Sequence, residues 1–459
     1  MNGWWASLSL VDGAVPVIVD LAQLLLVAAV VVLALFGRRS RLGARDRRVR
    51  GRLGRGLIIA ASALAGSLVG WASCWLLSDQ WDLFDVSLTP VSRAWVAVAF
   101  AGVGVAVTGA ALSGWRARIV ATAAVVASLM AGAIGVNADF GQYTTVGSLS
   151  DHQVAPPLPA SLLALQAHAA PDRLGHAAAS ATPSSRPQNG SGSSVAHGVV
   201  GSVVIPATVS HFAARPAYIY LPPAALRAHP VPLPVIVMLS GQPGSPGTVI
   251  SSGNIAAIFD SFARSHGGVA PIVVVADQLS APQNNPMCVD GALGASESYL
   301  TVDVPNWIRS HLTVRTAAKD WAIAGFSQGG TCAIQLGSAH PGLFSDIIDV
   351  SGQLAPKNGG LHQTIALGFG GDANLYRASL PQTVLARRAP YLDSVAVFGV
   401  GQLDTRYGPV SVVMSASAGR AGIQTTRVVS PGTGHDWHTV QWVLKNELTP
   451  IYRHMGLER

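Results

Sequence analysis

Four long apolar segments in the first third of the chain constrain its fold more than any other feature. Each is about 20 residues long, which is enough for a helix to cross the hydrocarbon core of a bilayer. Backbone groups in lipid have no water to bond, so a spanning segment must be a helix or part of a closed barrel. Only 12% of the 459 residues are charged, about half the usual fraction. We therefore expect a four-helix membrane anchor over residues 1–139, built from residues 15–36, 57–77, 94–115 and 119–136.

The positive charge of the chain is concentrated in one short segment. Nine arginines and one aspartate between residues 38 and 55 give that segment a net charge of +8, whereas the whole chain carries +7. Basic residues beside apolar segments mark the cytoplasmic side of a membrane, and they can also contact anionic membrane lipid. The acidic stretch 78–85 fits the opposite side. We expect a multi-pass cell-membrane protein whose N-terminus and residues beyond 137 lie outside the cytoplasm, with no nucleic-acid partner.

Asp20 lies inside the first apolar segment. An ionisable side chain within a membrane is a functional candidate. We favour the simpler explanation, that this carboxylate lies near the outer headgroups or packs inside the helix bundle. No path of charged residues crosses the four segments, so anchoring is the simplest role for this part of the chain.

The composition and residue pattern of the sequence change twice after the apolar segments. Residues 140–199 lack a regular pattern and include a Ser-, Gly- and Pro-rich stretch at 181–194, which is typical of a flexible linker. Residues 140–165 could lie on the membrane surface or fold against a neighbouring part. Residues 200–459 alternate short apolar runs with helical patterns, which predicts an α/β domain with a mostly parallel sheet covered by helices on both faces. The expected strands are 202–206, 217–221, 234–239, 271–276, 321–324, 347–351, 394–399 and 425–430.

One of these runs leads directly into Gly325-Phe326-Ser327-Gln328-Gly329, a G-x-S-x-G pattern. Where such a pattern joins a strand to a helix, the sharp turn exposes the serine Oγ as a nucleophile, and the glycines let strand and helix approach closely. The alternative is an ordinary turn serine, which a glycine-rich chain can produce by chance. Its position between an expected strand and an expected helix favours Ser327 as the nucleophile.

A serine nucleophile needs a base, and the base needs an orienting carboxylate. In α/β-hydrolases these partners follow in the order Ser, Asp or Glu, His, on loops after later strands. Asp404 follows strand 394–399, and His435 lies in a glycine-rich loop after strand 425–430. We therefore expect a triad of Ser327, Asp404 and His435. The rival candidates are His438 for the base, and Asp372 and Asp393 for the acid.

The remaining site residues are expected from the same logic. An oxyanion hole needs two backbone N–H donors. The first should be Gln328, and the second should come from the loop after strand 234–239, at Gln242 or Gly241. Cys288 and Cys332 would both lie in an oxidising compartment, which favours a disulfide between them. We expect no metal site and no cofactor, because no metal-ligand spacing, P-loop or dinucleotide fingerprint occurs in the sequence.

The C-terminal part resembles the esterase D and antigen 85 mycolyltransferase branch of the α/β-hydrolases. The resemblance covers about residues 198–450, and the four-helix anchor is similar to that of membrane-bound esterases of actinobacteria. It implies hydrolysis of carboxylic esters or acyl transfer to a sugar hydroxyl such as trehalose. The family's mycolyltransferases usually carry methionine or another residue after the serine and a glutamate as the acid, so Gln328 and Asp404 favour hydrolysis. The matching stretches are Arg215-Pro-Ala-Tyr-Ile-Tyr-Leu-Pro-Pro, Gly325-Phe-Ser-Gln-Gly-Gly, Leu403-Asp404, and Gly434-His435-Asp-Trp437 with Trp442 downstream.

Three hypotheses about function follow. The first is a membrane-tethered extracytoplasmic serine esterase that hydrolyses acyl-ester or lipid substrates of the cell envelope through an acyl-enzyme. The second is an acyltransferase that uses the same residues to move an acyl chain to a sugar or envelope hydroxyl. The third is an inactive hydrolase-fold module that binds or scaffolds envelope components.

Overall fold

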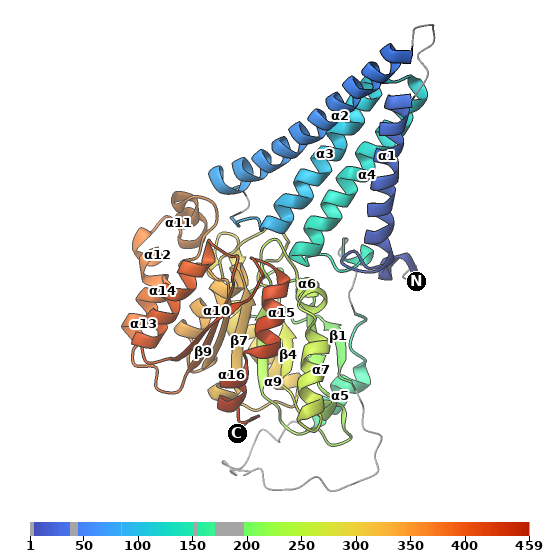
Figure 1. Cartoon of the computed structure of the whole chain (residues 1–459). Helices are drawn as coiled ribbons and strands as arrows, with labels where there is room; N and C mark the ends of the chain where they lie inside the picture. Colours follow the sequence, from blue (N-terminus) through green and yellow to red (C-terminus); the bar gives the residue numbers. More distant parts are fainter. Residues whose placement is uncertain (1–3, 37–44, 84, 150–154, 170–196, 459) are drawn as a thin grey trace, which may run out of the picture. The chain divides into compact units, whose positions relative to one another are not determined.

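The structure, a computed structural model, describes residues 4–36, 45–83, 85–149, 155–169 and 197–458 (Figure 1). The Ser-, Gly- and Pro-rich stretch 181–194 and the first arginines of the basic cluster, Arg38, Arg39 and Arg41, lie outside the described residues. The chain divides into two compact units. The first unit comprises Met1–His152, Gly401–Arg406 and Gly432–His438, and the second comprises Gln153–Val400, Tyr407–Pro431 and Thr439–Arg459.

Long helices dominate the first unit (Figure 1). In the described part of the chain, four helices are long and apolar enough to cross a membrane, as the sequence predicts. One boundary differs, because helix α2 already begins at Arg45, inside the basic cluster that we expected to form a loop. Arginine is a good helix former, so the helix continues through part of the cluster. The helices are α1 (Ala14–Phe36), α2 (Arg45–Cys74), α3 (Pro90–Leu112) and α4 (Trp115–Phe140), with the shorter η1 (Trp4–Ser7), η2 (Trp75–Gln80) and η3 (Val146–Leu149).

Small residues bring these helices close together. A methyl group on Gly66 of α2 would lie 2.2 Å from the carbonyl oxygen of Phe100 in α3. A methyl group on Gly104 of α3 would lie 2.4 Å from the carbonyl oxygen of Ser62 in α2. Backbone contact of this kind is how helices pack where water does not drive association. The Ala- and Gly-rich composition of the apolar segments therefore forms a packed bundle.

An eight-stranded sheet forms the framework of the remaining chain, in the order β1-β2-β4-β3-β7-β8-β9-β10. Strands β4, β3, β7, β8 and β9 pair in parallel, whereas β1 and β2 add at one edge in antiparallel pairings. This confirms the expected α/β fold with a mostly parallel sheet. The strands are β1 (Val199–Val203), β2 (Ala217–Leu221), β3 (Val235–Leu239), β4 (Ile272–Val275), β7 (Trp321–Phe326), β8 (Asp346–Val350), β9 (Val395–Gly401) and β10 (Gln424–Ser430), and a separate small hairpin consists of β5 (Asp290–Gly291) and β6 (Gly294–Ala295).

Helices connect the strands, as expected for parallel pairing. The connection between β8 and β9 is the longest and carries three short helices that the sequence patterns did not predict. The helices of this part are α6 (Pro246–Ser252), α7 (Ile255–Ser265), α8 (Ser296–Ser298), α9 (Val304–His311), α10 (Gln328–Ala339), α11 (Leu361–Phe369), α12 (Ala373–Ser379), α13 (Pro381–Arg388), α14 (Tyr407–Arg420), α15 (Trp437–Asn446) and α16 (Thr449–His454), with η4 (Pro223–Leu226), η5 (Tyr299–Asp303) and η6 (Ala318–Asp320).

The segment that we expected to be a linker, residues 140–199, contains ordered structure. Helix α5 (Ala160–Ala169) lies within it and belongs to the second unit. Leu158 is part of the core of that unit. Gln166 is fully buried, and its side-chain amide donates to the carbonyl of Ala225 over 2.5 Å. The ambiguous stretch before residue 170 therefore folds partly against the sheet domain, and a tether remains a proposal for residues 170–196, which lie outside the described residues.

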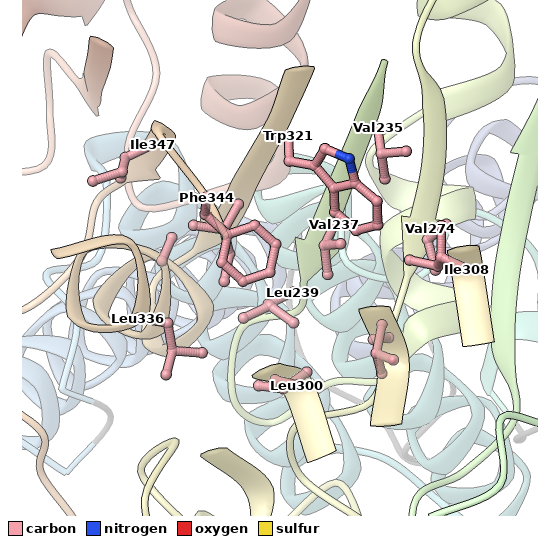
Figure 2. Close-up of a cluster of buried hydrophobic side chains, with 14 of the residues drawn as sticks. Val235, Val237, Leu239, Val274, Leu300, Ile308, Trp321, Leu336, Phe344 and Ile347 are labelled. Atoms are coloured by element: carbon pink, nitrogen blue, oxygen red, sulfur yellow. The ribbon is translucent and has the colours of Figure 1, made fainter. Parts of the chain in front are cut away.

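The core lies between the parallel strands and their helices. Alternate residues of β3, namely Val235, Val237 and Leu239, join one apolar cluster, and the intervening Ile236 is also fully buried. Burial of both faces explains why the strand reads as a continuous apolar run. Figure 2 shows this cluster, in which Trp321 of β7 lies among the valines of β3. The rigid central strands place their carboxyl ends, where the site residues follow, at fixed positions.

Candidate active site

Ser327 occupies a strained turn between β7 and α10. Its backbone has φ 56° and ψ −117°, a combination that a residue with a side chain rarely adopts. The turn is held on both sides, because the N–H of Ser327 donates to Val350 of β8 over 2.8 Å and its carbonyl accepts from the N–H of Thr331 over 3.0 Å. The predicted strand-to-helix turn around Ser327 is therefore present in the structure.

The flanking glycines are required by close backbone contacts. A methyl group on Gly325 would lie 2.1 Å from the carbonyl oxygen of Gly329. A methyl group on Gly329 would lie 2.4 Å from the carbonyl oxygen of Ser240, at the end of β3. Any side chain at either position would push the start of α10 away from the sheet. The two glycines of the G-x-S-x-G pattern thus set the position of the serine between them.

Asp404 and His435 form a buried pair on two adjoining loops. Oδ2 of Asp404 lies 2.9 Å from Nδ1 of His435, and their side chains are 0% and 4% exposed. The loops contact each other directly, since the N–H of Leu403 donates to Thr433 over 2.8 Å. A carboxylate only accepts hydrogen bonds, so Nδ1 carries a proton, and Nε2 is the ring nitrogen left to exchange a proton with a substrate or nucleophile. This is the arrangement that a general base requires.

The rival candidates have other partners in the structure. Asp372 caps helix α12, accepting from the N–H groups of Asn374 and Leu375. Asp393 lies 2.9 Å from Nε2 of His454. His438 lies within α15, with its Nε2 3.0 Å from the carbonyl oxygen of Ala138. Of the five candidates for the acid and the base, Asp404 and His435 are the two that the structure brings together.

The residues expected at the oxyanion hole lie beside the elbow. The Cβ position of Gly241 is 3.4 Å from Cβ of Ser327, so the loop after β3 adjoins the serine. Gln328 is the first residue of α10, where backbone N–H groups have no partner within the helix. The side chain of Gln242 is turned to a different contact, donating to the carbonyl of Gln283 over 3.2 Å. Only backbone N–H groups of these residues are therefore candidates for binding an oxyanion.

A buried amide network fixes the side chain of Gln328. Its Nε2 donates to Oδ1 of Asn285 over 3.1 Å, and its Oε1 accepts from Nε2 of Gln278 over 2.9 Å. Gln278 also donates to the carbonyl of Ser240 over 2.6 Å. These contacts connect the start of α10 to the loop after β3. Sequence reasoning missed Gln278 and Asn285, and the one available signal was that Gln278 closely follows an expected strand.

The expected disulfide between Cys288 and Cys332 is present, with Cα atoms 5.7 Å apart. It joins the loop that carries Asn285 to helix α10, directly behind the elbow. Nε2 of Gln335, also on α10, donates to the carbonyl of Cys288 over 3.0 Å and strengthens the same connection. The disulfide therefore supports the amide network around Gln328.

One ion pair and one buried carboxyl group support the site from behind. Arg215 pairs with the fully buried Asp277 through Nε and Nη2, and its Nη2 donates to the carbonyl of Gly244 over 3.0 Å. This holds the far end of the loop after β3. Asp349 of β8 is buried near the start of α10, and burial raises the pKa of its carboxyl to about 8. Its Oδ1 accepts from the N–H of Gly352 over 2.8 Å.

No group of three or more His, Cys, Asp or Glu side chains suited to a metal ion occurs among the described residues.

Residues 213–438, which include Ser327, Asp404 and His435, match the sequence model of the family Esterase, described as "Putative esterase". This part of the chain is therefore similar to the esterase family, and its mostly parallel sheet with connecting helices fits the α/β-hydrolase fold. The strand order of its sheet and the turn around Ser327 agree with this assignment.

Other proteins are similar to this chain. Over 256 residues, 55% of its length, the chain is 33% identical to an uncharacterized protein of Corynebacterium glutamicum, and it spans 60% of that protein's length. Among solved structures, a ferulic acid esterase is 17% identical with a TM-score of 0.47, covering 56% of this chain and 97% of its own. An S-formylglutathione hydrolase from Agrobacterium tumefaciens is 18% identical with a TM-score of 0.46, covering 57% and 96%. MPT51 of Mycobacterium tuberculosis is 15% identical with a TM-score of 0.42, covering 57% and 99%.

Proposed function

We propose that the protein is a membrane-tethered serine esterase that acts outside the cytoplasm on carboxylic esters of the cell envelope. Two observations together carry this proposal: a serine on a strained strand-to-helix turn, and a buried Asp404–His435 pair that follows it in the chain. A turn with positive φ costs about 1–3 kcal/mol and persists where it serves a function. Similarity to the esterase family supports the same reaction class.

The proposed reaction uses the triad in two steps. Nε2 of His435 takes the proton of Ser327 Oγ as the oxygen attacks the ester carbonyl, and Asp404 stabilises the imidazolium through Nδ1. Backbone N–H groups of Gln328 and of Gln242, or Gly241, would bind the developing oxyanion. His435 then protonates the leaving alcohol, which leaves an acyl group on Ser327. A water molecule activated by His435 hydrolyses this acyl-enzyme.

The proposed location outside the cytoplasm has two supports. The helices α1–α4 fit membrane anchoring by length and composition. The Cys288–Cys332 disulfide is of a kind that persists in oxidising compartments. The basic cluster would then lie on the cytoplasmic side, and residues 1–139 would anchor a catalytic domain whose partners are membrane lipid and envelope esters.

A fluorophosphonate probe tests the catalytic part of the proposal. The full-length protein in detergent should be labelled, and Ser327→Ala should not. Ser265→Ala is a matched control, because Ser265 is an exposed serine whose Oγ donates to the carbonyl of Phe262 and lies 3.0 Å from Nδ1 of His266. Equal labelling of wild type and Ser327→Ala would refute the nucleophile and leave a binding or scaffold module as the better assignment.

Two more experiments test the product and the topology. Incubation with an acyl ester and trehalose should yield free acid, and a new sugar ester would reassign the protein as an acyltransferase. Gly190→Cys should react in intact cells with a membrane-impermeant maleimide. Labelling of this cysteine only after lysis would contradict the extracytoplasmic location.

A further inference from the structure

The loops that carry Asp404 and His435 belong to the same compact unit as the apolar helices. They contact two short stretches at the ends of those helices: the connection from η2 to α3, and the end of α4. We call these two stretches the helix-end cluster. It consists of Asp82, Asp85, Ser87, Thr89, Ala138 and Gln142.

The Asp404 loop makes polar contacts through Thr405 and Arg406, the two residues that directly follow Asp404. Arg406 pairs with both carboxylate oxygens of Asp82, and its Nη2 lies 2.5 Å from Oδ1 of Asp85. A guanidinium held by two carboxylates has a fixed orientation, because its fork matches their geometry. Oγ1 of Thr405 lies 3.2 Å from Oγ of Ser87. The two residues after Asp404 are thus both attached to the connection between η2 and α3.

The His435 loop is attached on both sides of the histidine. Before it, a methyl group on Gly434 would lie 2.6 Å from Cγ2 of Thr89, the residue that caps α3. After it, Nε1 of the buried Trp437 donates to Oε1 of Gln142 over 2.8 Å. Next along the chain, His438 contacts the carbonyl oxygen of Ala138.

The cap itself is linked to α4. Oγ1 of Thr89 and Oγ of Ser92 both donate to Oδ2 of Asp139, the first in a short hydrogen bond. The contact with Gly434 and the contacts with Trp437 and His438 therefore belong to one connected surface formed by α3 and α4. A shift of either helix would move the attachment points of the His435 loop together.

We propose that the helix-end cluster positions the Asp404–His435 pair, with Arg406 as the positioning residue. This rests on the proposed esterase function. A displacement of about 1 Å in a catalytic group can cost about a hundredfold in rate. Arg406 does not contact the reacting atoms in this scheme, so its loss should slow the chemical step and leave substrate binding almost unchanged.

The test measures kcat and KM for ester hydrolysis by the full-length protein in lipid nanodiscs. Arg406→Gln should lower kcat at least about tenfold with KM within about twofold of wild type. Arg406→Lys keeps the positive charge but not the planar guanidinium, so its kcat should lie between those of wild type and Arg406→Gln. Arg315→Gln is the matched control, since Arg315 pairs with Asp320 and has nearly the same side-chain exposure as Arg406, 35% against 33%. Its kcat should equal that of wild type.

Substitutions of Asp82 and Asp85, the partners of Arg406, distinguish a positioning role of Arg406 from a general loss of protein stability. The double variant Asp82→Asn/Asp85→Asn leaves the catalytic loops untouched and should reproduce the defect of Arg406→Gln. Combined with Arg406→Gln it should add no further loss, because all three residues act through one interaction. If Arg406→Gln does not fold, as judged by thermal unfolding, the double variant alone decides.

Either of two results would overturn the positioning role: a kcat within twofold of wild type for the variants that fold, or losses that add in the combined variant. Fluorophosphonate labelling keeps this outcome separate from failure of the esterase proposal. Loss of labelling in Ser327→Ala together with normal kcat in Arg406→Gln would reject only the positioning role. Equal labelling of wild type and Ser327→Ala would reject the esterase function beneath it.

Discussion

The substitution Gly329→Ala tests the geometry of the elbow most directly. A Cβ at this position would lie 2.4 Å from the carbonyl oxygen of Ser240 and 2.7 Å from that of Leu239. Both atoms belong to the backbone at the end of β3, so no side-chain rotation can relieve the contact. Reaching even the 3.0 Å lower limit of real Cβ contacts requires a shift of at least 0.6 Å at the start of α10.

That shift should be transmitted to Ser327, two residues earlier in the same turn. Because a misplacement of about 1 Å can cost a hundredfold in rate, we expect kcat to fall about 10- to 100-fold. Overpacking of this kind should also destabilise the fold by about 1–3 kcal/mol. Hydrolysis of a chromogenic ester gives kcat, and fluorophosphonate labelling gives the reactivity of Ser327 independently of substrate binding.

Gly342→Ala is the control, because a methyl group there would meet no atom within 4 Å. It makes the same chemical change in the unfolded chain, so any difference between the two variants reports packing in the folded state. If Gly329→Ala hydrolyses ester at a rate within twofold of Gly342→Ala, the close approach of α10 to β3 does not set the position of Ser327.

Three further outcomes are expected. Asp404→Asn should lower kcat by about 10⁴-fold with little change in KM, since the wrong tautomer of His435 would be stabilised; steady-state kinetics would show it, and a near-normal kcat would mean that another group orients the histidine. Replacing Cys288 and Cys332 by serine opens a loop with a sequence separation of 44 and should lower the free energy of unfolding by about 4 kcal/mol, measured by urea denaturation against the single variant Cys74→Ser. Burial raises the pKa of Asp349 to about 8 in the folded state, whereas in the unfolded chain its pKa is the ordinary 3.8. The free energy of unfolding of wild type should therefore fall relative to that of Asp349→Asn as pH rises from about 4 to 8, and it should level off above pH 8. Equal pH dependence of the melting temperatures of the two proteins would contradict that burial effect.

Local patterns in the sequence were sufficient to predict several strands of the sheet. β2 was predicted at 217–221, as observed, because a continuous apolar run there ends at prolines on both sides. β1 was expected at 202–206 but spans Val199–Val203. Val199 pairs with Leu221 and Val203 with Ala217, so the partner strand selects the register from a longer apolar stretch. Pairing of this kind is not encoded in the run itself.

The residues of the candidate site also fall into two groups, those with a local sequence signature and those without one. The turn at Ser327 has a local signature, and the order of Asp404 and His435 after later strands indicated a pair that the structure places in contact. The amide network around Gln328 has no such signature, because Gln278 and Asn285 precede it by 50 and 43 residues. Arg406 meets Asp82 across 324 residues of sequence. Contacts of this type follow from the tertiary fold alone and could not be predicted from patterns.

Helix α5 changes what joins the sheet domain to the rest of the protein. Gln166 bonds to Ala225 and, through both its side chain and its carbonyl, to Thr313, while Leu158 packs into the core. Residues 155–169 are thus held by the sheet domain without help from the chain that follows them. A protease cut anywhere in residues 170–196 would break the covalent chain but leave this segment bound as a complementing fragment. If residues 1–139 anchor the protein in a membrane as proposed, the domain would stay attached there after loss of the peptide link. A recombinant domain should begin near residue 155 to keep its own partner helix.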